Sequence, residues 1–168
     1  MKRTIIFGNS AAGKSTLAQE ISLAESLPHF DLDLVAWQAT TPPARKPLLE
    51  SKQEINDFVS ANEDWVIEGC YADLLEIVMP LASDLIFLNL PIETCINNAK
   101  NRQWEPHKYE SKQAQDANLE MLLDWIAQYD QREDTFSRFA HQTLFDRYDG
   151  EKTMYTTNDY KPATLNDD

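Results

Sequence analysis

The sequence predicts an α/β fold, in which a parallel sheet of five short strands is covered by helices on both faces. Short apolar runs suited to buried strands alternate with segments whose apolar residues recur at helical spacing. A loop of small residues separates the first apolar run from the first helical segment. Acidic residues and glycines follow several of the runs, at the strand ends where parallel sheets bind ligands.

The first strand is expected in a β-branched and aromatic run, and the helix after it carries apolar residues at helical spacing. The Pro-rich stretch 40–45 breaks any regular structure. A single domain is expected over residues 1–157, followed by a loose tail at 158–168. The expected strands are residues 4–7, 29–33, 65–69, 84–91 and 152–157. The later helices are expected around residues 55–59, 74–82, 92–102, 119–129 and 134–147.

Composition limits the classes of partner. The 168 residues include 15 Lys and Arg against 28 Asp and Glu, a formal net charge of -13, which disfavours long nucleic acid as a partner. The two cysteines, Cys70 and Cys95, lack the spacing of a metal or disulfide motif and indicate reduced thiols in a cytoplasmic protein. No apolar run approaches the roughly 20 residues of a membrane-spanning helix, so no membrane partner is expected.

The loop after the first strand matches the pattern GxxxxGK(S/T) in full. Its small residues allow successive backbone N–H groups to point at phosphate oxygens, and the next helix adds its partial positive charge. Lys14 would reach the β and γ phosphates, and the Ser15 hydroxyl would coordinate Mg²⁺. The pattern predicts a nucleoside triphosphate site, and the absence of an NKxD motif favours ATP. The residues expected to contact ATP are Gly8, Asn9, Ser10, Ala11, Ala12, Gly13, Lys14, Ser15 and Thr16.

Acidic residues end two of the expected strands. Asp31 and Asp33 end the second strand and would share one face of the sheet if that strand stays extended. A carboxylate there can hold a Mg²⁺-bound water or accept the proton of an attacking hydroxyl. Glu68 ends the third strand, where an acid can orient Mg²⁺ through water. The alternative for all three is a solvated acid on an acidic chain.

The loop at 8–15, DLD at 31–33, WVIEGCY at 65–71 and DLIFLNLP at 84–91 together resemble the P-loop small-molecule kinases. This group includes shikimate kinase, gluconate kinase and the adenylate-kinase-like enzymes, and the nearest resemblance is to bacterial topology-modulation (FlaR-related) proteins. It extends from residue 4 to about residue 102. The resemblance implies a P-loop NTPase three-layer sandwich with strand order 2-3-1-4-5, an ATP site with Mg²⁺, and a small lid at about 103–115.

The resemblance also implies roles for single residues. By position, Asp31 would lie toward the metal, Asp33 would contact the acceptor hydroxyl, and Arg102 would stack on adenine, although Arg102 is equally suited to a solvated helix end. EGCY stands where shikimate kinase has three glycines, so shikimate is disfavoured as the acceptor. The DGFPR segment of adenylate kinase is also missing, which disfavours a nucleoside monophosphate. The lid carries Lys108 and Lys112 but no arginine, which leaves Arg132 or Arg138 to cover the γ-phosphate.

Two functions follow from these patterns. The first is an ATP-dependent kinase that transfers the γ-phosphate to a small molecule, to a hydroxyl rather than a phosphate, with Lys14 and Asp33 as the catalytic residues. Trp37, followed by Arg45 and Lys46, lies where the resembled family has its acceptor-binding segment. It would stack on or pair with a small anionic acceptor, or it is a core residue. The alternative is a nucleotide-binding regulatory protein of the topology-modulation type, without a metabolite acceptor.

Overall fold

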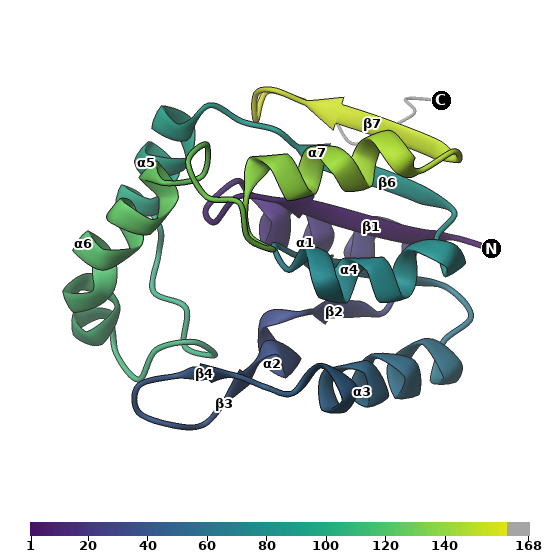
Figure 1. The fold of residues 1–168 in the computed structure, drawn as a ribbon, viewed down its shortest axis with the longest axis horizontal. Coiled ribbons are helices and arrows are strands. Elements are labelled where there is room, and N and C mark those ends of the chain that lie inside the picture. The colour runs from purple at the N-terminus through teal and green to yellow at the C-terminus, as the bar shows by residue number, and fades with distance from the viewer. Residues whose placement is uncertain (161–168) are drawn as a thin grey trace.

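A computed structural model describes residues 1–160 of the chain and confirms the α/β fold (Figure 1). Its main sheet has five strands, and every neighbouring pair in it is parallel. The central strand is flanked on both sides, so its residues Ile5, Ile6 and Phe7 are buried. The strands are β1 (Arg3–Gly8), β2 (His29–Asp31), β5 (Trp65–Gly69), β6 (Asp84–Leu88) and β7 (Glu151–Tyr155).

The strand order is β2-β5-β1-β6-β7, which differs in its numbers from the expected 2-3-1-4-5. The difference arises because β3 (Trp37–Gln38) and β4 (Ala44–Arg45) come between β2 and β5 in the chain and form a separate antiparallel hairpin. The sequence analysis missed this hairpin, because strands of two residues around a Pro-rich turn leave no alternating pattern. Counted within the main sheet alone, the first strand lies between the third and the fourth.

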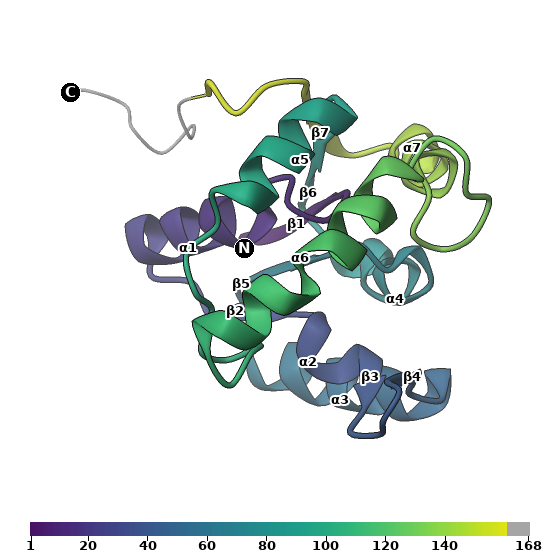
Figure 2. The ribbon, with the colours of Figure 1, turned by 90° about the vertical axis from the view of Figure 1, so that its left-hand side faces the viewer.

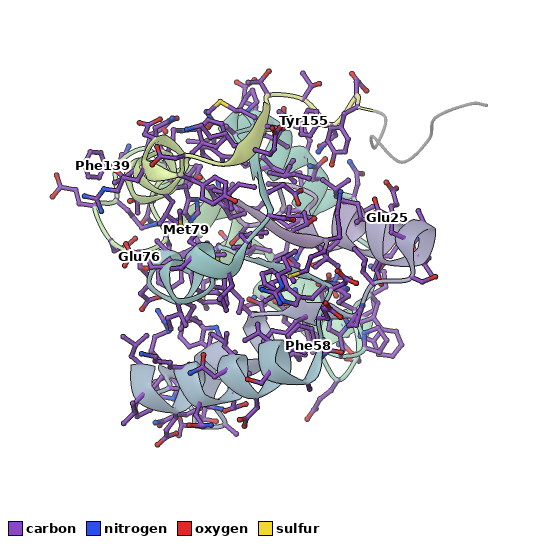
Figure 3. All side chains as sticks on the ribbon, turned by 90° about the vertical axis from the view of Figure 1, so that its right-hand side faces the viewer. Glu25, Phe58, Glu76, Met79, Phe139 and Tyr155 are labelled. Atoms are coloured by element: carbon purple, nitrogen blue, oxygen red, sulfur yellow. The ribbon has the colours of Figure 1, made fainter. Side chains whose placement is uncertain are left out.

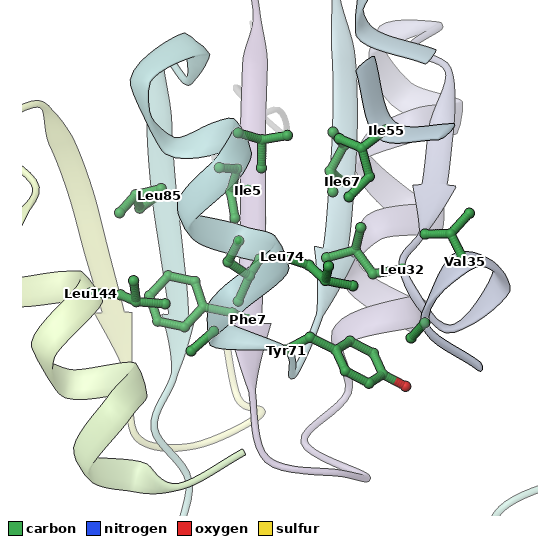
Figure 4. Close-up of a cluster of buried hydrophobic side chains, with 14 of the residues drawn as sticks. Ile5, Phe7, Leu32, Val35, Ile55, Ile67, Tyr71, Leu74, Leu85 and Leu144 are labelled. Carbon is green, nitrogen blue, oxygen red and sulfur yellow. The ribbon is translucent and has the colours of Figure 1, made fainter. Parts of the chain in front are cut away.

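Helices cover both faces of the sheet. Ile5 and Phe7 of β1 point to one face, where the cluster in Figure 4 also contains Leu74 and Leu144. Ile6 points to the opposite face, as the period of two along a strand requires. The first face packs against α3 (Leu48–Ala61), α4 (Ala72–Val78) and α7 (Arg138–Arg147). The second packs against α1 (Lys14–Glu25), α5 (Ile92–Lys100) and α6 (Lys112–Ala127).

Several boundaries differ from the expected ones. The second strand ends at Asp31 instead of residue 33, because Leu32 has helical dihedrals and α2 (Asp33–Ala36) begins directly after it. The fourth strand ends at Leu88, before Pro91. The helix expected from residue 134 begins at Arg138, because the Ser137 side chain caps it by accepting from the N–H of Ala140.

The carboxyl ends of the strands lie beneath α5 and α6, which pack side by side (Figure 2). At the opposite side of the molecule, Phe58 of α3, labelled in Figure 3, stacks on Phe30 of β2 with ring centroids 4.6 Å apart. Within residues 1–160, no helix combines the length and the apolar character needed to cross a membrane.

Part of the expected C-terminal tail, residues 161–168, lies outside the described residues. Just before it, the Asn158 side-chain amide donates to the carbonyl of Ala12 at 3.1 Å. Tyr160 stacks on Tyr155, with ring centroids 4.5 Å apart. The chain after β7 therefore returns to the loop that follows β1.

Candidate functional site

The loop between β1 and α1 requires glycine at two positions. Gly13 has φ 94°, in the left-handed region that favours glycine. A Cβ on Gly8 would lie 2.6 Å from the carbonyl oxygen of Leu88, closer than any real contact. These two glycines therefore let the loop curl against β6 and then enter α1.

Polar side chains hold the loop closed on itself. The Lys14 ammonium donates to the carbonyl of Asn9 at 2.6 Å, so the side chain folds back over the loop. Asn9 is 2% exposed, and its Oδ1 accepts from the backbone N–H of Ser10 at 2.8 Å. Its amide nitrogen lies 3.3 Å from the carbonyl of Ile126 near the end of α6, which connects the loop to the helix above the sheet.

A buried group of oxygen atoms lies next to the loop. The Ser15 hydroxyl donates to Oε1 of Glu68 at 2.7 Å, and Glu68 is 2% exposed. Asp31 stands opposite Glu68 in the β2–β5 register. Burial and the neighbouring charges of Glu68 and Asp33 raise the pKa of Asp31 to about 6.

Hydroxyl and carboxylate oxygens are the ligands that Mg²⁺ prefers, so Ser15, Asp31 and Glu68 fit this ion chemically. In the described part of the chain, no group of three or more His, Cys, Asp or Glu side chains could hold a metal by itself. A Mg²⁺ ion here would therefore share its ligands with nucleotide phosphates and water, as Mg²⁺ commonly does.

Asp33 lies beside this group at the start of α2. Its backbone N–H donates to Oδ1 of Asp31 at 2.9 Å, which keeps the two carboxylates together although the strand has ended. The ammonium of Lys108, from the segment between α5 and α6, lies 2.8 Å from Oδ2 of Asp33 and 3.8 Å from Oδ2 of Asp31. The Tyr71 hydroxyl donates to Oδ1 of Asp33. Burial alone would raise the pKa of Asp33, but Lys108 and Tyr71 hold it below its usual value.

Sequence reasoning assigned no role to Lys108 at Asp33 or to Tyr71. Lys108 was visible only as a basic residue in the expected lid, far from Asp33 in the chain. Tyr71 was visible as the last residue of the WVIEGCY stretch. Their position relative to Asp33 depends on tertiary contacts, for which neither residue carries a local signal.

An aromatic cluster stands behind Asp33. Trp37, which is 39% exposed, lies parallel to Phe136 with ring centroids 6.5 Å apart, and Tyr71 meets both rings edge-on. The Arg45 guanidinium lies 5.1 Å from the Tyr71 ring and bonds both carboxylate oxygens of Asp73, at 3.0 and 3.1 Å. Arg45 is therefore engaged within the protein.

The three candidate arginines differ in what they already bind. Arg138 is paired with Asp130 and with the side chain of Asn89. Arg102, at the end of α5, has its Nη1 3.4 Å from Oε2 of Glu105. Arg132 differs from both, because two of its guanidinium nitrogens have no hydrogen-bond partner among the described residues.

The Arg132 side chain is 9% exposed and lies flat on Trp125, with its guanidinium carbon 3.6 Å from the ring centroid. Its Nη1 donates to the carbonyl of Trp125 at 2.6 Å. Its Nε and Nη2 are buried and have no hydrogen-bond partner among the described residues. The nearest acid, Asp134, is 3.8 Å from Nε, beyond hydrogen-bonding distance.

A buried network supports the turn after β5. His141 of α7 is fully buried, and its Nε2 lies 2.7 Å from the carbonyl oxygen of Cys70. Its Nδ1 lies 2.6 Å from the hydroxyl of Tyr129, so a neutral ring donates to Cys70 and accepts from Tyr129. Burial lowers the pKa of His141 to about 3 and raises that of the Cys70 thiol to about 12. The imidazole and the thiol are therefore both neutral at pH 7.

The fold is shared with known kinases. A sugar kinase from Janibacter sp. HTCC2649 matches with a TM-score of 0.53 at 10% identity, over 93% of this chain and 85% of that chain. The shikimate kinase from Acinetobacter baumannii, solved in complex with shikimate, matches with a TM-score of 0.53 at 16% identity, over 98% and 87%. No protein-family model and no curated protein matches the sequence. The chain therefore has the α/β fold that these small-molecule kinases adopt.

Proposed function

We propose that the chain is an ATP-dependent phosphotransferase that moves the γ-phosphate to a hydroxyl of a small anionic molecule. The observation that carries this proposal is the continuous path from the loop to Asp33. Ser15 contacts Glu68, Glu68 stands opposite Asp31, and Asp31 bonds the backbone of Asp33. A phosphate held by the loop would thus lie near a carboxylate that can receive the acceptor's proton.

Each residue has a defined task in this reaction. The loop amides and Lys14 bind the phosphates, and Ser15, with Asp31 and Glu68 through water, would hold Mg²⁺, which supplies positive charge to the phosphate oxygens. The acceptor oxygen forms a bond to the γ-phosphorus while the bond from that phosphorus to the bridging oxygen of ADP breaks. Asp33 accepts the proton of the acceptor hydroxyl. Arg102 at the end of α5 is assigned to the adenine, as the resemblance to adenylate-kinase-like enzymes suggests.

Arg132 supports an anionic acceptor. Two of its three guanidinium nitrogens are buried without a hydrogen-bond partner among the described residues, and a ligand carboxylate or phosphate would satisfy Nε and Nη2 together. Arg138, which the sequence offered beside Arg132 as a cover for the γ-phosphate, is already paired within the protein. We therefore assign Arg132 to the anionic group of the acceptor.

The test is ADP release by the purified protein with ATP and Mg²⁺ across pairs of compounds that differ in one anionic group, such as hydroxy acids and the matching alcohols. The proposal expects stimulation by an acid and none by its neutral partner. Stimulation by neutral sugars alone would remove the role of Arg132. ATP binding without stimulation by any compound would contradict the kinase and favour the regulatory alternative.

A further inference from the structure

The Asp33 carboxylate is held from two sides. Tyr71 donates to Oδ1, and Lys108 lies 2.8 Å from Oδ2. Tyr71 follows β5 after a short turn and is 3% exposed, so it belongs to the rigid core. Figure 4 shows its ring just beyond the end of β5, with the hydroxyl directed away from the sheet. Asp33 thus has one partner in the core and another in the segment between α5 and α6.

Trp37 determines which way the Tyr71 hydroxyl points. The indole nitrogen of Trp37 lies 2.8 Å from the Tyr71 oxygen, and an indole N–H can only donate. An ionised carboxylate can only accept. Burial raises the pKa of the Tyr71 hydroxyl well above its usual range, so this group keeps its proton. Tyr71 therefore accepts from Trp37 and donates to Asp33.

We infer that Tyr71 is a positioning residue, which orients the Asp33 carboxylate through its hydroxyl while Trp37 orients that hydroxyl. This inference rests on the proposed function, because the orientation of Asp33 matters for turnover only if Asp33 meets the acceptor. The last torsion of an aspartate side chain is broad, so a carboxylate without Tyr71 samples several orientations. A displacement of about 1 Å from the productive geometry can cost about a hundredfold in rate.

This assignment gives Trp37 a role beside the two interpretations that the sequence offered. Its one polar group is used by Tyr71, and its ring packs against Tyr71 and Phe136. Arg45 bonds Asp73 and lies over the same aromatic rings. Trp37 therefore acts on Asp33 through Tyr71, and Arg45 is engaged by Asp73.

Tyr71→Phe is the direct test, because it keeps the buried ring and removes only the hydroxyl. With an acceptor that stimulates ADP release, we expect kcat to fall about 10- to 100-fold while KM for ATP stays within about twofold. Trp37→Phe keeps the Tyr71 hydroxyl but frees its direction, so we expect a smaller loss of roughly three- to tenfold. The matched control is Tyr148→Phe. In the wild type the Tyr148 hydroxyl donates to the carbonyl of Ala82, so its loss should change neither kcat nor KM for ATP.

A spectrum reports the same chain of hydrogen bonds without any acceptor. In ¹⁵N-labelled protein, Asp33→Asn should shift the indole N–H resonance of Trp37, because Tyr71 connects the two groups. The shift should vanish when Tyr71→Phe is already present. The Trp104 indole donates to the carbonyl of Tyr109 and serves as the internal reference.

Two results would overturn the positioning role. One is a Tyr71→Phe variant that keeps wild-type kcat with an acceptor whose turnover is lost in Asp33→Asn. The other is an indole shift that persists in the Tyr71→Phe background. If no compound stimulates the wild-type protein, the proposed function itself fails and the positioning role falls with it, whatever the indole signal shows.

Discussion

The nucleotide side and the acceptor side of the candidate site are built in different ways. The nucleotide side is one continuous run, residues 8–15, whose backbone geometry is fixed by Gly8 and Gly13. The acceptor side, as we propose it, draws on side chains that lie far apart in the chain, Asp33 with Lys108 and, separately, Arg132. A ligand bound by successive backbone amides leaves a contiguous pattern in the sequence, whereas a ligand bound by scattered side chains does not.

The largest expected effect is on the nucleotide side. Lys14→Ala removes the charge that the loop presents to the phosphates, and we expect ADP release to fall on the order of a thousandfold. The fold should persist, because the Lys14 side chain is only partly buried and contacts the loop carbonyl of Asn9. Initial-rate measurements test this change, with the exposed Lys52→Ala on α3 as the control. Retained turnover in Lys14→Ala would contradict a role for this loop in binding the phosphates of ATP.

The next effect separates the two sides. Asp33→Asn removes the proposed proton acceptor while leaving the loop intact, so we expect kcat to fall about 100-fold or more. ATP affinity, measured by calorimetry, should stay within about threefold. Asp116→Asn on the surface of α6, where Asp116 pairs with Lys112, is the control for the loss of one negative charge. Equal losses of kcat and ATP affinity would show that Asp33 belongs to the nucleotide side.

The same difference explains what the sequence could predict. All five strands of the main sheet were expected from the sequence, and β1, β5 and β6 were recognisable because buried parallel strands are mostly apolar. The short β2 and the largely exposed β7 carry polar residues, and they were expected from the segments that follow Pro28 and Gly150. The loop pattern was recognisable because its residues are adjacent in the chain. The pairing of Asp31 with Asp33 was expected from an extended strand, but it arises from the backbone N–H of Asp33 at the start of α2.

The surroundings of Asp33 and of Arg132 depend on tertiary contacts that no local sequence pattern encodes. Lys108 reaches Asp33 only because α5 and α6 bring their connecting segment over the sheet. The free nitrogens of Arg132 are recognisable only once the neighbours of the guanidinium are known. From the sequence, Arg132 and Arg138 were equivalent, whereas the structure shows one partly unpaired and the other engaged.

A third change tests the acceptor side alone. Arg132→Met keeps much of the packing on Trp125 but removes the charge, and we expect KM for an anionic acceptor to rise about 10- to 100-fold. KM for ATP should not change. The melting temperature should not fall, because a buried charge without a full set of partners is replaced by an apolar group. Arg147→Met at the exposed end of α7 is the control, and an unchanged acceptor KM in Arg132→Met would remove the anion site.

The smallest effect concerns the support of the acceptor side. Burial lowers the pKa of His141 to about 3, below the value near 6.5 of an unfolded chain. Between these values the unfolded chain binds a proton that the folded protein does not. His141 therefore makes stability fall as the pH drops below about 6.5, by up to about 1.4 kcal/mol per pH unit.

His141→Gln removes this titration while leaving a group that can bond the Cys70 carbonyl. At pH 7 the variant should be less stable than the wild type by about 1–3 kcal/mol, because one buried hydrogen bond is lost or weakened. The gap should narrow by roughly 1 kcal/mol or more for each pH unit between 6 and 4, as urea unfolding would show. His107→Gln, at an exposed position between α5 and α6, is the control for the loss of an imidazole and should leave the stability at pH 7 unchanged. A constant gap across this range would mean that His141 is protonated in the folded protein, and that the turn carrying Cys70 and Tyr71 is held by a different set of hydrogen bonds.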